Sequence, residues 1–434
     1  MSRAARWGAA AVLLAAIASL AAADLIPTPN FSRHAIPTSQ LPAARGPFRE
    51  IADTALLLAA LSAATYGALV SRSRKSLFAL SIASLVWFGF WRKGCICSVG
   101  SIQYVALAIF QRDYVVPYSA VAFLVLPLIF TLFFGRTFCA AVCPLGAVQE
   151  LVAVRSIQVA RWLDHALGLL KYFYLGAAVL LAASGTAFLI CRYEPFVAFF
   201  RLHGNANIVL FGGALLLVGL FVGRPYCRYL CPYGALLAMV SRLSKWHVRI
   251  PPTECIKCRL CEDVCPYGAI RRPTVDPSPA EMAAGRRRLA WLLLATPAMI
   301  ALTAAAGTML ADPLARLDPE VALAEQLRRE ELGLTAATTD ATDAFRNARR
   351  PADDLYRSVA RRRSHFRWLG ALLGGWVGVV VCGKLVSLSI WRRRSDYRPD
   401  QAGCVACGRC FWYCPVEQVR LGLIQDPAEV VPAR

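Results

Sequence analysis

Two matching cysteine rows are the residues in this sequence best suited to hold a metal cofactor. Each row has the spacing C-x2-C-x2-C-x3-C and is followed directly by proline, which is the spacing of bacterial ferredoxins that bind [4Fe–4S] clusters. A structural zinc site would instead favour two separated cysteine pairs. The rows therefore predict two [4Fe–4S] clusters. Their members are Cys255, Cys258, Cys261 and Cys265 in the first row, and Cys404, Cys407, Cys410 and Cys414 in the second.

The fourth cysteine of each row raises a question of pairing. In two-cluster ferredoxins this cysteine binds the cluster of the other row. We therefore expect one cluster to take Cys414 in addition to the first three cysteines of row one. The second cluster would take Cys265 in addition to the first three cysteines of row two. The alternative is that each row supplies all four ligands of its own cluster.

The composition predicts a membrane protein. The chain has 434 residues, of which 57% are hydrophobic, and a formal net charge of +21. Several apolar runs approach or exceed the ~20 residues that a helix needs to cross a bilayer. The arginines flank these runs, so the positive charge is explained by membrane topology rather than by nucleic-acid binding. The runs cover about 52–70, 77–91, 116–134, 171–190, 206–223, 289–310 and 367–390.

Charge patterning predicts the orientation of these spans. With the N-terminus inside and alternating spans, most arginine clusters fall on the cytoplasmic side, as the positive-inside rule requires. Both cysteine rows then lie in the cytoplasm, separated by a hairpin of two spans. The predicted divisions are 1–24 (signal anchor or signal peptide), 25–50 (external), 51–76 (span and inner loop), 77–250 (membrane core), 251–285 (ferredoxin half 1), 286–394 (hairpin with external loop 311–366) and 395–434 (ferredoxin half 2).

An internal repeat marks the predicted membrane core. Residues 134–152 read FGRTFCAAVCPLGAVQELV, and residues 222–240 read VGRPYCRYLCPYGALLAMV. Because duplicated membrane units often place functional groups between the copies, we expect a duplicated four-span core. The segments after the prolines, Leu145 to Trp162 and Tyr233 to Trp246, mix apolar and basic residues, which predicts helices along the inner membrane surface.

Each copy of the repeat carries a Cys-x3-Cys-Pro motif. Facing copies would bring four thiols together, namely Cys139, Cys143, Cys227 and Cys231. Soft thiolates suit a third iron–sulfur centre, a redox dithiol pair or copper. The remaining alternative is that these small residues only shape a turn.

Three further cysteines are expected near the outer side of the membrane: Cys95, Cys97 and Cys191. They could form a disulfide or a second redox site, with His203 as a fourth ligand suggested by position alone. No C-x-x-C-H motif is present, so covalent c-type haem is not expected.

These motifs together resemble the membrane polyferredoxins of the NosR and NapH type, over roughly residues 77–270 and 395–418. The resemblance implies a mainly α, polytopic membrane protein with a split 2[4Fe–4S] ferredoxin domain (α+β) on its cytoplasmic face, in the bacterial inner membrane. It implies electron transfer between a cytoplasmic donor or quinol and a periplasmic redox partner protein. The alternative is a maturation or regulatory factor for a periplasmic metalloenzyme. Flavin is expected only on a partner, because residues 25–50 are too few to bind one.

The sequence contains no recognisable catalytic site for a small substrate. No nucleotide-binding loop, metal-hydrolase helix or nucleophile elbow occurs in a usable context. The chain is therefore expected to act as an electron-transfer component of a redox chain rather than as an enzyme on its own.

Overall fold

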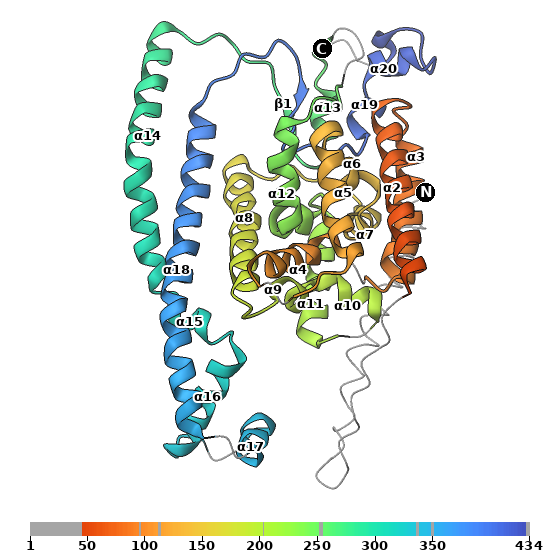
Figure 1. Cartoon of the computed structure of the whole chain (residues 1–434). Helices are drawn as coiled ribbons and strands as arrows, with labels where there is room; N and C mark the ends of the chain where they lie inside the picture. Colours follow the sequence, from red (N-terminus) through yellow and green to blue (C-terminus); the bar gives the residue numbers. More distant parts are fainter. Residues whose placement is uncertain are drawn as a thin grey trace.

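The fold is mainly helical, and several of its helices are long and apolar enough to cross a membrane (Figure 1). The computed structural model describes residues 46–94, 97–111, 114–202, 204–250, 255–335, 338–348 and 351–430. Within them four helices are long and apolar enough to span a bilayer, and the bent pair of α10 (Pro195–Arg201) and α11 (Ala206–Gly219) could form a fifth span. The four are α2 (Pro47–Leu69), α8 (Arg161–Ala183), α14 (Pro279–Thr308) and α18 (Ala352–Ser389).

The N-terminal expectations fall largely outside the described residues. The signal anchor or signal peptide at 1–24 and most of the external segment at 25–50 belong to them. Helix α2 begins at Pro47, a few residues before the predicted start of the first span, because proline suits the first turn of a helix. It forms a hairpin with α3 (Arg74–Ser84), whose N-terminus is capped by the side chain of Ser73. Helix η2 (Leu85–Trp91) continues α3.

The repeat region fills the centre of the bundle. All of its helices except α8 are shorter than a complete span, since glycines and prolines interrupt them. The elements of the first half are α4 (Ser98–Phe110), α5 (Tyr118–Phe134), α6 (Thr137–Ala141), α7 (Pro144–Val152) and α8. Those of the second half are α9 (Leu189–Tyr193), α10 (Pro195–Arg201), α11 (Ala206–Gly219), η3 (Tyr226–Leu230), α12 (Pro232–Val240) and η4 (Ser241–Leu243).

The prediction of helices along the inner membrane surface is wrong. Helix α7 ends at Val152 rather than near Trp162, and six of its nine residues are buried. Helix α12 is equally buried, and the Tyr233 hydroxyl donates to the Leu124 carbonyl in the middle of α5. Figure 1 draws α7 and α12 at mid-height, between the ferredoxin end of the bundle and α4. Both short helices therefore enter the bundle interior instead of lying on its surface.

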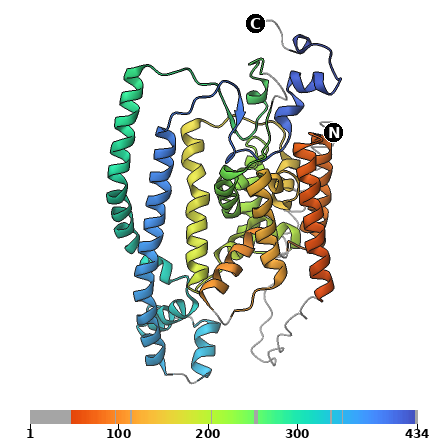
Figure 2. The same cartoon turned by 45° about the horizontal axis from the view of Figure 1, so that its top comes forward.

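The second half of the chain adds a long hairpin beside this core. Figure 2 shows α14, α18 and α8 side by side. Trp376 of α18 joins the hairpin to the core, because its indole Nε1 donates to the Tyr172 carbonyl over 2.8 Å. The 38 residues of α18 would measure about 57 Å at the rise of an α-helix, nearly twice the ~30 Å apolar core of a bilayer. One end of α18 must therefore extend beyond the membrane.

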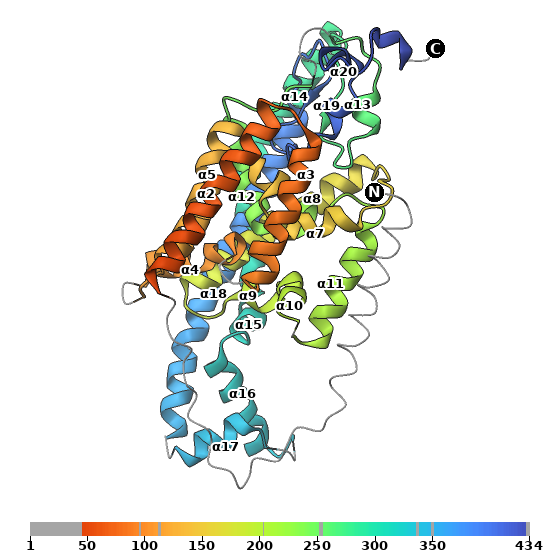
Figure 3. The ribbon, with the colours of Figure 1, turned by 90° about the vertical axis from the view of Figure 1, so that its right-hand side faces the viewer.

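The extended end of α18 carries a small helical cap, at the bottom of Figure 3. The cap contains α15 (Ala311–Ala315), α16 (Pro319–Glu331) and α17 (Asp340–Asn347). It has its own apolar cluster, to which Val321, Leu327 and Phe366 contribute. Arg362 of α18 also donates to the buried Asp318 carboxylate over 2.9 Å. Most of the predicted external loop 311–366 is therefore helical among its described residues.

Close packing of α14 on α18 depends on small residues. A Cβ at Gly374 would collide with the Thr303 carbonyl, and one at Gly307 with the Gly370 carbonyl. We expect Gly374→Ala to destabilise the protein by about 1–3 kcal/mol through overpacking. Gly383→Ala in the same helix is the control, because a Cβ there would meet nothing within 4 Å. Thermal unfolding in detergent should lower the Tm of the first variant only; equal melting of both would contradict this packing.

Candidate metal centres

A two-stranded sheet joins the two cysteine rows. The first row includes α13 (Leu260–Asp263) and leads into β1 (Ile270–Arg271). Strand β2 (Arg398–Pro399) leads into the second row, and Ile270 pairs with Pro399 in antiparallel register. The Asp400 amide also donates to the Ala269 carbonyl over 2.7 Å. The rows therefore adjoin in space although α14 and α18 separate them along the chain. Short helices α19 (Arg409–Trp412), α20 (Pro415–Arg420) and η5 (Pro427–Glu429) complete this end.

The eight cysteines line two cavities, and each cavity takes residues from both rows. We call them cavity A and cavity B. Their empty volumes are nearly equal, about 340 and about 350 Å³ including the open mouths. This is the grouping that exchange of the fourth ligand would require. The cysteines of cavity A are Cys255, Cys258, Cys261 and Cys414, and those of cavity B are Cys404, Cys407, Cys410 and Cys265.

The surroundings of both cavities fit a [4Fe–4S] cluster. Backbone N–H groups point at the sulfurs; the Ala406 amide, for example, donates to Cys404 Sγ over 3.4 Å. The other lining residues are largely apolar. Among the described residues no three His, Cys, Asp or Glu side chains converge as a single metal ion would require. A cubane has no such need, because each of its four irons takes one cysteine.

The buried cysteines of the two rows are protonated in the absence of a bound metal. Burial raises the pKa of the Cys404 thiol to about 12, and it raises that of Cys261 to about 12 as well. At neutral pH both would be neutral thiols without a positive centre beside them. Binding of iron as thiolates would therefore release protons, and assembly of the clusters should be favoured by higher pH.

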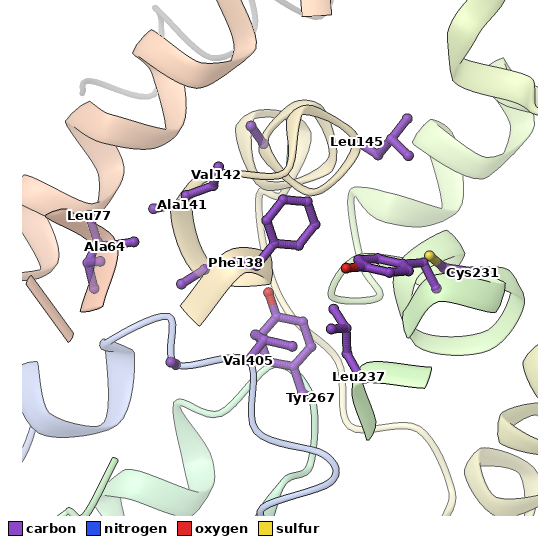
Figure 4. Close-up of a cluster of buried hydrophobic side chains, with 14 of the residues drawn as sticks. Ala64, Leu77, Phe138, Ala141, Val142, Leu145, Cys231, Leu237, Tyr267 and Val405 are labelled. Carbon is purple, nitrogen blue, oxygen red and sulfur yellow. The ribbon is translucent and has the colours of Figure 1, made fainter. Parts of the chain in front are cut away.

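The Cys-x3-Cys-Pro motifs have matching local structures. In each motif the first cysteine lies in a short helix, α6 or η3. The second cysteine is the N-cap of the following helix, whose first residue is Pro144 or Pro232. Proline thus occupies the first turn of each following helix, where its missing N–H costs no hydrogen bond. Figure 4 shows Phe138 of the first motif near the centre of a buried cluster with Cys231 of the second. Tyr267 and Val405, from the two ferredoxin halves, lie in the same cluster.

Two buried arginines cross between the motifs. Arg136, beside the first motif, would be in contact with a Cβ at Gly234 of the second. Arg224, beside the second motif, would be in contact with a Cβ at Gly146 of the first. Arg136 Nη2 also donates to Cys139 Sγ over 3.7 Å, and Arg224 Nη1 donates to the Cys139 carbonyl. The two copies therefore contact each other reciprocally through the Gly-Arg of the repeat.

The four motif cysteines lie within electrostatic reach of one another. The thiols of Cys227, Cys143 and Cys139 all lie close enough to Cys231 for a charge on any of them to act on it. The Gln149 side-chain amide donates to Cys227 Sγ over 3.2 Å, which ties α7 of the first copy to the second motif. Arg136 is 4% exposed, and its Nε has no hydrogen-bond partner among the described residues. A buried cation of this kind favours a negative charge on the neighbouring sulfurs.

The carboxylate of Glu150, which no sequence motif marks, lies between the Cys-x3-Cys-Pro motifs and the ferredoxin end. Glu150 of α7 accepts from Arg74 and Arg224 at 3.2 Å each, and from Arg409 of the second row. The Tyr267 hydroxyl, two residues after the first row, donates to the same carboxylate over 3.2 Å. Sequence reasoning missed this group, because one glutamate in a mostly apolar segment gave no pattern to read.

The outer cysteines are only partly brought together. Cys97 lines an apolar cavity together with Cys143 of the first motif. Cys191 lies beside α4, since its sulfur would be 3.5 Å from a Cβ at Gly100. Cys95 and His203 fall outside the described residues. Buried Glu194 nearby was also missed by the sequence analysis; it accepts from the Tyr226 hydroxyl, and its Oε1 has no partner among the described residues.

Comparison with known proteins shows which proteins the chain is similar to. A family model described as a 4Fe-4S binding domain matches residues 116–169 and 205–251, which contain both Cys-x3-Cys-Pro motifs. Another 4Fe-4S binding domain model matches residues 248–271, which contain the first cysteine row. The regulatory protein NosR of Pseudomonas aeruginosa is 31% identical over 46% of this chain and 30% of NosR. The ferredoxin-type protein NapH of Escherichia coli is 30% identical over 32% of this chain and 51% of NapH. The chain is homologous to NosR and NapH over these matched parts.

Other relatives of this NosR/NapH homologue cover it in the same partial way. Protein NirI of Paracoccus denitrificans is 37% identical over 39% of this chain and 28% of NirI. The chain thus spans between 28% and 51% of the length of these three relatives. No solved structure matches it.

Proposed function

We propose that this protein passes electrons across a membrane between a ferredoxin module at one end and a redox partner at the other. The observation that carries this proposal is the grouping of eight cysteines, four around each of two equal cavities, on top of a membrane core that contains further cysteines. A [4Fe–4S] cluster bound by such cysteines supplies one-electron redox chemistry. The ferredoxin-type relative NapH supports this assignment.

Cavity B is the better placed of the two to communicate with the membrane core. Arg136 Nη1 donates to the Ala402 carbonyl, two residues before Cys404, over 3.0 Å. The same guanidinium contacts Cys139 of the first motif. Beyond that motif, Cys143 shares a cavity with Cys97. The cysteines of cavity A, cavity B, the motifs and Cys97 thus form an ordered series through the bundle.

The motif cysteines are proposed as a third centre in this series. The match of a 4Fe-4S binding domain model to residues 116–169 and 205–251 supports an iron–sulfur centre at Cys139, Cys143, Cys227 and Cys231. The buried positive charges of Arg136 and Arg224 suit the net negative charge of a thiolate-bound cluster. The reciprocal contacts of these arginines support a duplicated core, with the centre between its copies.

The proposed orientation places the ferredoxin module in the cytoplasm. Arg286 to Arg288 lie near the ferredoxin end of α14, and Arg392 to Arg394 follow the same end of α18. Clusters of positive charge next to spans mark the cytoplasmic side. The cap formed by α15, α16 and α17 would then face the periplasm, where it could contact a redox partner protein.

The test is a redox titration of the detergent-purified protein monitored by EPR. Two clusters require about eight iron atoms and eight acid-labile sulfides per chain, and a third cluster about twelve of each. Signals from at least two interacting [4Fe–4S] centres are expected. Purified protein containing zinc and no iron would refute the proposal.

A maturation or regulatory role is the second candidate, favoured by the similarity to the regulatory protein NosR. We expect the double variant Cys139→Ser/Cys227→Ser to keep both ferredoxin signals while transmembrane electron transfer in vesicles falls at least tenfold, because the series of cysteines is interrupted. The periplasmic partner enzyme should remain fully metallated. A metal-deficient partner with normal electron transfer would favour maturation instead.

A further inference from the structure

The loop at the mouth of cavity A has an unusual choice of residues. Both cysteine rows use the same backbone shape, with left-handed residues at the third and fifth positions. In the second row these are Ala406 (φ 53°) and Gly408 (φ 78°). In the first row they are Lys257 (φ 58°) and Arg259 (φ 68°).

Packing does not explain why Lys257 and Arg259 occupy these left-handed positions. A left-handed conformation costs a non-glycine residue about 1–2 kcal/mol, and small residues meet the geometry of this loop in row two. Ala406 is buried, whereas Lys257 and Arg259 are exposed. Neither cation has an ion-pair partner in the part of the chain that the structure describes. Lys257 and Arg259 are therefore long charged side chains that face solvent from strained backbone positions.

Two exposed apolar side chains flank these cations. Ile256 follows Cys255 and is 47% exposed, and Tyr413 precedes Cys414 and is 48% exposed. We call Ile256, Lys257, Arg259 and Tyr413 the entry surface. The nearby Glu262 carboxylate forms ion pairs with Arg272 at 2.7 Å and with Arg161 at 3.8 Å. Asp263 is therefore the exposed acidic residue of α13. The entry surface is thus positive, with an apolar component beside the cysteines.

Cavity B lies on the opposite side of the module, against the membrane core. Arg74 of α3 donates to the Cys407 carbonyl over 3.1 Å. Gly408 packs against the same helix, because a Cβ added at this glycine would lie 3.4 Å from the Leu77 side chain. A soluble protein can therefore approach cavity A through the entry surface more readily than cavity B.

We propose that the entry surface is the docking site of a soluble, acidic one-electron carrier protein. This inference rests on the proposed function and names where its electrons enter. Lys257 and Arg259 would attract the acidic face of the carrier, and Ile256 and Tyr413 would exclude water at the contact. One electron would pass from the reduced carrier, which is thereby oxidised, to the [4Fe–4S] cluster that the cysteines of cavity A would hold. No bond forms or breaks and no proton is required.

The experiment replaces the first loop by residues that the second loop already uses. The variant Lys257→Ala/Arg259→Gly keeps the backbone shape of the second row, and glycine at 259 relieves the strain there, so both clusters should be retained. Reduction by flavodoxin hydroquinone, an acidic probe, is followed by stopped-flow at low ionic strength. We expect the second-order rate constant to fall at least tenfold and to lose most of its salt dependence. Reduction by the methyl viologen radical cation should not slow.

A matched control removes two exposed cations elsewhere. Arg361→Ala/Arg363→Ala lies on the extended end of α18 and changes the net charge equally. It should leave the flavodoxin rate within about twofold, because charges beyond a Debye length are screened. Equal losses in both variants, or an unchanged rate in the loop variant, would overturn the proposal. The proposal would also be overturned if the loop variant lost only its binding to anionic phosphatidylglycerol vesicles, because Lys257 and Arg259 would then bind a lipid surface. Protein without reducible clusters would refute the proposed function itself.

Discussion

Protein carrying Cys407→Ser together with Cys414→Ser is expected to lose both ferredoxin clusters, whereas Cys258→Ser with Cys414→Ser should lose only one. The reason is that Cys414 lines cavity A with Cys258, and Cys407 lines cavity B. The first pair of substitutions therefore removes one ligand from each cluster, and the second pair removes two ligands from the same cluster. Iron and sulfide analysis with EPR would count about four fewer iron atoms for each cluster lost.

Ligation within each row gives the opposite pattern. If Cys414 served the second row, Cys407→Ser/Cys414→Ser would keep one cluster and Cys258→Ser/Cys414→Ser would keep none. Cys382→Ser is the control for loss of a cysteine as such, because Cys382 is buried in α18 away from both rows. It should retain all iron. The comparison does not depend on which cluster gives which EPR signal.

The sequence predicted the longest helices, although only four of its seven apolar runs correspond to described helices long enough to span a bilayer, and one more to a bent pair. Apolar runs indicated the spans because a bilayer demands length and hydrophobicity together. The antiparallel pairing of Ile270 with Pro399 makes the rows adjacent, which follows once α14 and α18 form a hairpin. The repeated Gly-Arg was visible too, although its reciprocal contacts were not, since two copies in one chain do not reveal how they face each other.

The burial of α7 and α12 could not be read from composition. Both helices are followed by basic residues, which favoured a surface position. In the structure their small residues allow close approach instead. A Cβ at Gly146 would press on the Cys139 carbonyl and Arg224, and one at Gly234 on the Cys227 carbonyl. Glu150 and Gln149 are buried because α7 lies inside the bundle, where partners distant in sequence satisfy them.

Glu150 is the point at which the separate parts of the protein are held together electrostatically. Its partners come from the N-terminal hairpin, the second motif and both ferredoxin halves: Arg74, Arg224, Tyr267 and Arg409. Burial alone would raise the pKa of this carboxyl, but the charges of Arg224, Arg409 and Arg74 outweigh burial and lower its pKa from 4.5 to about 2. The lowered pKa means that the folded state strongly favours the ionised carboxylate.

Glu150→Gln is therefore expected to destabilise the protein by about 3–5 kcal/mol, because three partly or fully buried guanidinium groups lose their counter-charge. The fall of the pKa from 4.5 to about 2 corresponds independently to about 3 kcal/mol. Since the folded pKa is the lower one, this stability is complete above pH 4.5 and is lost as the pH falls towards 2. Thermal loss of cluster absorbance in detergent measures it.

The pH dependence separates this role from simple packing. The Tm difference between wild type and Glu150→Gln should be large at pH 7 and shrink in acid, as the wild-type carboxyl becomes protonated. Asp354→Asn is the control, because its ion pair with Arg357 is exposed on both sides and such pairs contribute about 0–1 kcal/mol. A Tm difference for Glu150→Gln that stays constant down to pH 3 would show that shape rather than charge matters at this position. If it shrinks as expected, an ionised carboxylate contributes to the attachment of the ferredoxin module to the membrane core, beside the contacts of Arg136 and Arg74 with the second row. Acid should then weaken that attachment before it unfolds the span hairpin, in which small-residue contacts between α14 and α18 predominate.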